Sequence, residues 1–174
     1  MVKRSPDEAE TLIAGVKAEA TDALENLRDL ARGIYPPLLA DKGLAAALDS
    51  QVRKAAVPTS LDTAGVGRYP QEVEAAVYFC TLEAMQNVSK YANAASARVR
   101  LRASNGDLTF AVSDDGAGFD PASTGYGTGL QGMADRLEAL GGDLAVRSSP
   151  GTGTVVEGRI PVPGGHDPDP RSPS

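Results

Sequence analysis

Apolar residues recur at spacings of three and four along the first part of the chain, and charged residues occupy the positions between them. The apolar positions are Ile13, Val16, Ala20, Leu24, Leu27, Leu30 or Ala31, and Ile34. This pattern predicts one long helix from about Glu8 to Ile34, which Pro36 and Pro37 end. Such a narrow stripe needs a partner: it either packs on its own domain or forms a bundle seam between subunits.

The rest of the chain alternates between helical and strand patterns. The predicted helices are a short segment after Gly43, residues 71–93 and residues 130–140. The predicted strands are residues 57–61, 97–103, 108–113, 144–148 and 154–160. Asn105-Gly106 predicts a two-residue hairpin, and residues 116–129 have the composition of a glycine-rich loop. Helices and antiparallel hairpins in this order predict an α+β sandwich in which helices cover one face of a sheet.

The composition is that of a globular protein, with 41% hydrophobic and 23% charged residues among 174. This length allows one compact domain and an additional element. A net charge of −6 argues against direct binding of DNA or RNA, although a small nucleotide site can be locally positive. No apolar run approaches the roughly 18 residues of a membrane span. We therefore expect no membrane segment in this chain and a cytoplasmic location, which also suits the cytoplasmic part of a membrane-bound receptor.

Cys80 and His166 have reactive side chains, but their places in the sequence argue against a catalytic role. Cys80 is the only cysteine, so no intrachain disulfide forms, and its place in the apolar stripe of residues 71–93 predicts a small core residue. His166 is the only histidine and lies in a stretch rich in Pro, Gly, Asp and Ser, residues 163–174, which we expect to be disordered. Neither residue is therefore a candidate for catalysis.

Three polar residues form a row beside that apolar stripe. Glu83, Asn87 and Lys90 stand at i, i+4 and i+7 of the predicted helix. The row is either a solvated stripe with an ion pair or a site for magnesium and phosphate. In the second case Asn87 would offer an oxygen to Mg²⁺, Lys90 would neutralise phosphate charge, and Glu83 would orient a proton on the attacking group.

Two glycine-containing segments follow this helix. Asp114 ends a strand and could accept a hydrogen bond from an exocyclic amine, while Gly116 and Gly118 allow close approach to a ring. The same spacing is also common in ordinary turns. Residues 127–132 match G-x-G-x-x-G and open a helix whose free N–H groups suit a phosphate. A loop precedes this segment where a dinucleotide-binding fold would have a strand.

In combination, four segments resemble the boxes of the ATP-binding domain of two-component sensor histidine kinases, which are Bergerat-type (GHKL) ATPases. Residues 83–92 resemble the N box and residues 114–120 resemble the G1 box. Residues 127–133 resemble the G2 box, and residues 149–154 resemble the closing G-x-G-T box. The resemblance implies a two-layer sandwich with a mixed, mainly antiparallel sheet, preceded by one long helix.

The resemblance also implies a role for each matching residue. Glu83 would be the catalytic residue that orients the incoming imidazole, Asn87 would ligate Mg²⁺, and Asp114 would read the adenine amine of ATP. Thr154 would support the contact between Asp114 and adenine. The implied ATP-binding residues are Asn87, Lys90, Tyr91, Asp114, Gly116, Gly118, Gly127, Thr128, Gly129, Leu130 and Thr154.

The implied domain layout places the second helix of a dimerisation and phosphotransfer hairpin in residues 1–38. The ATP-binding catalytic domain would occupy residues 39–162, followed by the tail 163–174. A phosphoacceptor histidine domain would act in cis or in trans, and the full-length protein would be a homodimer that relays phosphate to a response regulator. Residues 27–36 and the short lid at 119–127 are similar to those of kinases that pair with helix-turn-helix response regulators.

Two other functions are compatible with the same fold: an anti-sigma-factor-type Ser/Thr kinase and a non-catalytic nucleotide-binding module. The long helix with its Pro-Pro ending argues against the first. The presence of Glu83, Asn87 and Asp114 argues against the second. A gyrase-like or chaperone-like ATPase is disfavoured by the short lid and the short chain.

Overall fold

The computed structural model describes residues 9–20 and 35–163. The chain divides into two units, Met1–Pro37 and Leu38–Ser174. In the first unit residues 9–20 are helical, as predicted for that part, and the predicted continuation to Ile34 falls on residues 21–34, outside the described residues. Leu12, Ile13 and Val16 are each 60% exposed or more, so within the described residues their apolar stripe has no cover.

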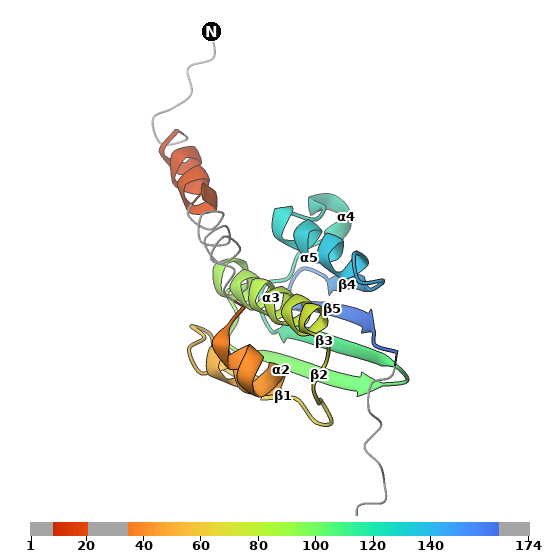
Figure 1. Ribbon diagram of the computed structural model, residues 1–174. Helices are drawn as coiled ribbons and strands as arrows, with labels where there is room; N and C mark the ends of the chain where they lie inside the picture. The colour runs from red at the N-terminus through yellow and green to blue at the C-terminus, as the bar shows by residue number, and fades with distance from the viewer. Residues whose placement is uncertain (1–8, 21–34, 164–174) are drawn as a thin grey trace, which may run out of the picture. The chain divides into compact units, whose positions relative to one another are not determined.

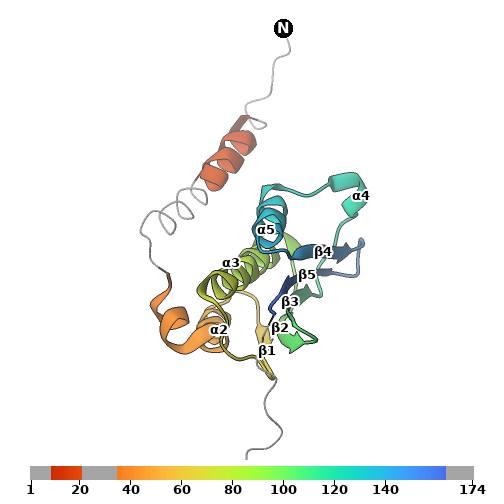
Figure 2. The same ribbon diagram turned by 45° about the vertical axis from the view of Figure 1, so that its right-hand side comes forward.

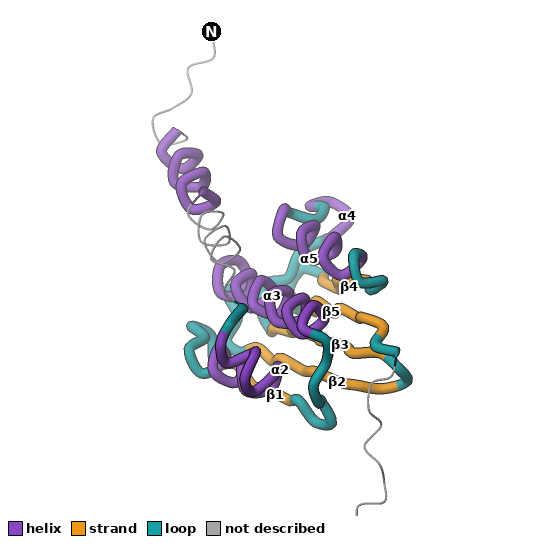
Figure 3. The backbone as a smooth tube through the Cα atoms, viewed as in Figure 1, coloured by secondary structure: helices purple, strands orange, loops and turns teal. Residues whose placement is uncertain are grey.

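The second unit contains one five-stranded sheet (Figures 1 and 3). Its strands are β1 (Thr59–Asp62), β2 (Ala97–Ser104), β3 (Asp107–Asp114), β4 (Asp143–Ser148) and β5 (Thr154–Pro161). They are arranged in the order β1-β2-β3-β5-β4. Only β1 and β2 are parallel; the other three pairings are antiparallel. The prediction of an α+β fold with a mixed, mainly antiparallel sheet is therefore confirmed.

Helices pack on one face of this sheet (Figures 1 and 2). They are α2 (Pro37–Val52), α3 (Gln71–Asn87) with its continuation η1 (Val88–Ala92), and α5 (Thr128–Glu138), while the short α4 (Pro121–Thr124) follows β3. None of the helices in the described residues is long and apolar enough to cross a membrane. The core side chains that are 2% exposed or less include Leu39, Leu44, Leu48, Val77, Val99, Leu101, Leu108, Phe110, Val112, Leu137 and Ile160.

The alternation of side chains along the strands produces this arrangement. In β2, Val99 and Leu101 are fully buried against the helices, whereas Arg98 and Arg100 are exposed on the other face. The hairpin from β2 to β3 turns at Asn105 and Gly106, which have φ angles of 53° and 79°. Positive φ at both central residues is the requirement of a type I′ turn, so the predicted Asn-Gly hairpin is confirmed.

The helix predicted after Gly43 begins earlier, at Pro37, and Gly43 forms a kink inside it with a φ of 81°. Proline is favoured in the first turn of a helix, where its missing N–H is not needed. The guanidinium of Arg68 covers the kink: it donates to Ala40 O at 3.0 Å and to Glu74 Oε1 at 2.9 Å. Glu74 is only 1% exposed, so this ion pair fixes α2 to the start of α3.

The loop predicted for residues 116–129 also contains a helical turn, α4. The Asp120 carboxylate caps it by accepting the N–H of Ala122 at 3.0 Å, and Pro121 occupies its first turn. Aspartate followed by proline is a typical helix start, and in the sequence the surrounding glycines obscured it. The lid therefore has a short ordered element between Phe119 and Gly127.

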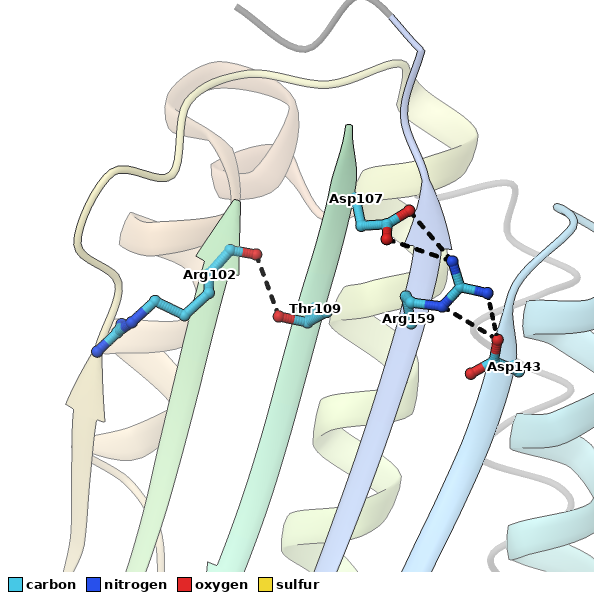
Figure 4. A network of polar contacts seen from close by, with 5 residues as sticks. All are labelled: Arg102, Asp107, Thr109, Asp143 and Arg159. Atoms are coloured by element: carbon cyan, nitrogen blue, oxygen red, sulfur yellow. Dashed lines mark hydrogen bonds and ion pairs between the residues drawn. The ribbon is translucent and has the colours of Figure 1, made fainter. Parts of the chain in front are cut away.

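Charged residues stabilise the end of the open sheet face that lies away from Asp114 (Figure 4). Arg159 of β5 donates to Asp107 of β3 at 3.3 Å and to Asp143 of β4 at 2.6 Å. The hydroxyl of Thr109 donates to the carbonyl of Arg102 at 3.3 Å. Arginine thus bridges three neighbouring strands at one end of the sheet, and the loop after β3 and the loop before β5 lie at the other end.

We predict that Gly158→Ala destabilises the second unit. Gly158 lies opposite Phe110 in the β3–β5 ladder, and a Cβ there would overlap the Phe110 ring and lie 2.8 Å from Leu137 Cδ1. Overpacking of this kind costs about 1–3 kcal/mol, which urea unfolding would measure. In the control Gly132→Ala, no atom lies within 4 Å of the added methyl. Gly132→Ala lies in a helix and should stabilise the second unit by about 0.5–1 kcal/mol. Equal stability of the two variants would contradict the close packing of Gly158 against Phe110 and Leu137.

Candidate functional site

The long helix α3 and its continuation η1 carry the first group of candidate residues. The predicted apolar stripe is buried against the sheet, including Cys80, whose burial raises the pKa of its thiol to about 12. Glu83 and Asn87 are half-buried beside this stripe. From Val88 the chain continues as a π-helix, and Asn93 closes it in the left-handed conformation with a φ of 48°. Such π-helical turns are frequent at functional sites.

Within this π-helix, Lys90 and Tyr91 are exposed, Tyr91 by 74%. The N-box residues therefore fall into two environments: Glu83 and Asn87 border the core, and Lys90 and Tyr91 face outward. The side chain of Asn87 makes no capping hydrogen bond to η1.

The G1 segment begins where β3 ends. Asp114 Oδ1 accepts the N–H of Gly116 at 2.8 Å, which turns the chain sharply after the strand. The next N–H, that of Ala117, donates to the carbonyl of Ala92 at 2.7 Å. A Cβ at Gly116 would overlap this same carbonyl, so only glycine permits the contact. The end of the N box and the start of the G1 box thus lie in direct backbone contact.

The closing loop, residues 149–153, packs on the other side of the G1 segment. Gly151 N–H donates to Ala117 O at 2.6 Å. Gly118 and Gly153 have φ angles of 63° and 79°, and a Cβ at either would overlap backbone of the opposite loop, at Ser149 O and Asp114 O respectively. Both glycines are required by conformation and by space.

A hydroxyl network joins these loops to the sheet. Ser148 ends β4 directly opposite Thr154 of β5, and Thr154 is in turn the register partner of Asp114. Ser148 Oγ accepts the N–H of Phe119 at 2.9 Å and lies 2.8 Å from Thr154 Oγ1. Ser148 was not predicted from the sequence as a site residue, although its place opposite Thr154 in the predicted hairpin was a signal that could have identified it.

Asp115 is a second residue whose role was not predicted from the sequence. Its carboxylate accepts the N–H groups of Ala95 and Ser96 at 2.8 and 2.9 Å and the hydroxyl of Ser96 at 2.8 Å. Hydrogen bonds from the Ser96 N–H and hydroxyl lower the pKa of this carboxyl. Asp115 thereby fixes the turn that connects η1 to β2.

The G2 segment meets α3 through a glycine. Gly127 precedes α5, and Gly129 lies in its first turn, where an added Cβ would be 2.5 Å from Glu83 Oε1. Leu130 is buried, whereas Gly127 and Thr128 are exposed. The structure therefore brings Glu83 to the start of α5, where backbone N–H groups have no intrahelical partner.

These groups fit a nucleotide better than a metal held by protein ligands alone. Among the described residues, no group of three or more His, Cys, Asp or Glu side chains could hold a metal ion. Asn87 offers one amide oxygen, and a magnesium ion satisfied mainly by phosphate and water needs few protein ligands. The glycine contacts keep side chains out of the junction of the loops, and the Asp114 carboxylate supplies an acceptor there.

Comparison with known proteins places these segments in one family. Residues 72–164 match the family described as "Histidine kinase-, DNA gyrase B-, and HSP90-like ATPase". The chain is 33% identical to the sensor histidine kinase MctS of Rhizobium johnstonii, over 89% of this chain and 35% of that protein. It is 30% identical to the signal transduction histidine-protein kinase/phosphatase DegS of Brevibacillus brevis, over 90% of this chain and 42% of that protein.

The chain therefore spans about a third to two fifths of these curated relatives. A solved structure, the histidine kinase domain of the blue-light activated histidine kinase of Erythrobacter litoralis EL346, aligns with a TM-score of 0.53 and 27% identity. The alignment covers 68% of this chain and 58% of that one. This chain belongs to the family of histidine kinase-, DNA gyrase B- and HSP90-like ATPases, and the two relatives named above are histidine kinases of signal transduction.

Proposed function

We propose that this chain is the ATP-binding catalytic domain of a sensor histidine kinase. It binds Mg-ATP and transfers the γ-phosphoryl group to a histidine of a separate phosphoacceptor domain. The observation that carries the proposal is the meeting of four sequence-distant boxes: Ala117 N–H donates to Ala92 O, Gly151 N–H donates to Ala117 O, and Glu83 lies against Gly129. An isolated match to any one box would not support it.

In this proposal the base lies at the ends of β3 and β5. Asp114 accepts the exocyclic amine of adenine, Thr154 supports that contact, and Gly116 and Gly118 shape the pocket. Asp114 is half-buried, and one of its oxygens is held by the N–H of Gly116 at 2.8 Å. A carboxylate fixed in this way is oriented before the base arrives.

The phosphates would lie between η1 and the start of α5. Residues Gly127, Thr128, Gly129 and Leu130 would surround them with backbone N–H groups, Lys90 would contact phosphate, and Tyr91 would border the nucleotide. Asn87 would ligate Mg²⁺, which supplies charge neutralisation on the phosphates when bound. Glu83 would orient the imidazole of the incoming histidine.

The partners follow from the same reaction. The 174 residues contain one histidine, His166, which falls outside all four boxes and outside the described residues. We therefore infer that a phosphoacceptor histidine domain acts in cis or in trans and passes the phosphoryl group to a response regulator of the helix-turn-helix class. The exposed stripe of Leu12, Ile13 and Val16 supports the proposal that residues 1–38 belong to a dimerisation hairpin of a homodimeric protein.

Mg-ATP and Mg-ADP are expected to stabilise the protein. Nucleotide at about 100 times its Kd contributes about 2.7 kcal/mol, which raises the melting temperature by roughly 5–10 °C. Mg²⁺ with tripolyphosphate, which lacks the base, is the control and should give a smaller shift. No change in melting temperature with millimolar Mg-ATP would rule out the proposed site.

Asp114→Asn is expected to weaken ATP binding and to reduce the preference for ATP over GTP. A hydrogen bond to a charged group contributes about 1.5–3 kcal/mol, equivalent to a loss of about tenfold to a hundredfold in affinity. The matched control is Asp49→Asn on α2, where the exposed carboxylate pairs only with Arg53 at 2.8 Å in the described structure. Unchanged discrimination in competition binding would show that Asp114 does not read the base.

The 174-residue protein alone is expected to bind ATP without phosphorylating itself. Phosphoryl transfer depends on in-line positioning, and His166 belongs to none of the boxes. Incubation with labelled ATP should give no acid-labile label until a histidine-containing helical hairpin from the same genome is added. Label on His166 would contradict this expectation, and acid-stable label on serine or threonine of an added partner would favour the anti-sigma-factor-type kinase.

A further inference from the structure

The hydroxyl of Ser148 uses all of its hydrogen-bonding capacity. A serine hydroxyl donates one hydrogen bond and accepts two. Ser148 Oγ accepts the N–H of Phe119 at 2.9 Å and donates to Gly153 O at 3.1 Å. Thr154 Oγ1 lies 2.8 Å away, at the one acceptor position that remains.

By geometry either hydroxyl could donate in the pair of Ser148 and Thr154, and the other contacts of Ser148 favour one direction. If the Ser148 proton is directed at Gly153 O, the proton between the two side chains comes from Thr154. The opposite polarity would leave the carbonyl of Gly153, a buried residue, without that donor. With its proton used in this way, Thr154 Oγ1 presents only lone pairs to a bound molecule.

Asp114 presents the same kind of group beside it. Asp114 and Thr154 are directly opposite one another at the ends of β3 and β5, on the helix-covered side that also carries the buried Val112 and Val156. A carboxylate only accepts hydrogen bonds. The neighbouring donor, the N–H of Gly116, is already bonded to Asp114 Oδ1 at 2.8 Å. Two adjacent acceptors favour a ligand with an amino group and disfavour one with a carbonyl oxygen.

We propose that Ser148 is a specificity-determining residue. It accepts the hydroxyl proton of Thr154, so Thr154 Oγ1 can only accept a hydrogen bond from the ligand, and the site selects a purine with a 6-amino group over one with a 6-carbonyl. The inference rests on the proposed binding of ATP at this site. Ser148 acts through Thr154 and does not itself touch the base. Without the Ser148 hydroxyl, the Thr154 proton is free to turn toward a carbonyl oxygen, and discrimination decreases.

The test compares the Kd values of Mg-ATP and Mg-ITP, because ITP carries a 6-carbonyl and a hydrogen on N1 where ATP carries a 6-amino group and an unprotonated N1. The wild-type protein should prefer ATP. Ser148→Ala should lower the ATP-to-ITP preference by about three- to tenfold, the equivalent of one neutral hydrogen bond. Ser148→Thr, which keeps the hydroxyl, should restore the preference.

The matched control is Ser113→Ala, which removes a hydroxyl from the open face of β3 one residue before Asp114 and should leave the preference unchanged. If Ser148→Ala weakens ATP and ITP equally, Ser148 only holds the structure and the inference is wrong. If the variant binds ATP with an unchanged preference, the inference fails while the proposed function stands. Wild-type protein that binds neither nucleotide would overturn the proposed function and this inference with it.

Ser148→Cys provides the same comparison should the alanine variant not fold. The thiol keeps the shape of the side chain and weakens both types of hydrogen bond. A reduced ATP-to-ITP preference in this variant supports the inference, and an unchanged preference overturns it.

Discussion

The backbones of the loop after β3 and the loop before β5 lie so close to their neighbours that only glycine fits at three positions. A side chain at Gly116 would overlap Ala92 O, one at Gly118 would overlap Ser149 O, and one at Gly153 would overlap Asp114 O. Because side chains are absent there, the N box, the G1 box and the closing box meet through their main chains. The positions of the candidate groups in the G1 segment and the closing loop depend on these contacts.

The sheet supplies the rigid frame for this junction. Strand β3 is paired along its whole length with β2 on one side and β5 on the other, and its helix-facing residues Leu108, Phe110 and Val112 are buried. The strand therefore fixes where Asp114 stands. Arg159 joins the strands at the far end, and the candidate binding groups of the loops after β3 and before β5 lie at the opposite end.

The sequence predicted the architecture because each strand buries one face and exposes the other. The alternation of Val99 and Leu101 with arginines predicted the position of β2, and Asn105-Gly106 predicted the turn that connects β2 to β3. The boxes were also identifiable, since each depends on local residue types. The π-helical turn of η1 was not predictable in this way, because the apolar spacing of α3 continues into it without a break.

Local sequence patterns did not predict the residues whose hydrogen bonds join distant segments of the chain. Ser148 matters because of what stands opposite it in the β4–β5 register, and Asp115 because it accepts the N–H groups of a turn nineteen and twenty residues earlier. Neither has a distinctive local motif. Pairing the two predicted strands of the β4–β5 hairpin could have identified Ser148, whereas the contact of Asp115 becomes visible only in the folded structure.

Amide hydrogen exchange with and without saturating Mg-ATP tests most directly whether the four boxes form one nucleotide site. We expect slower exchange together in residues 83–92, 114–119, 127–130 and 149–154, with little change in β1 or α2. Protection confined to a single box, or located on the open face of the sheet, would contradict it.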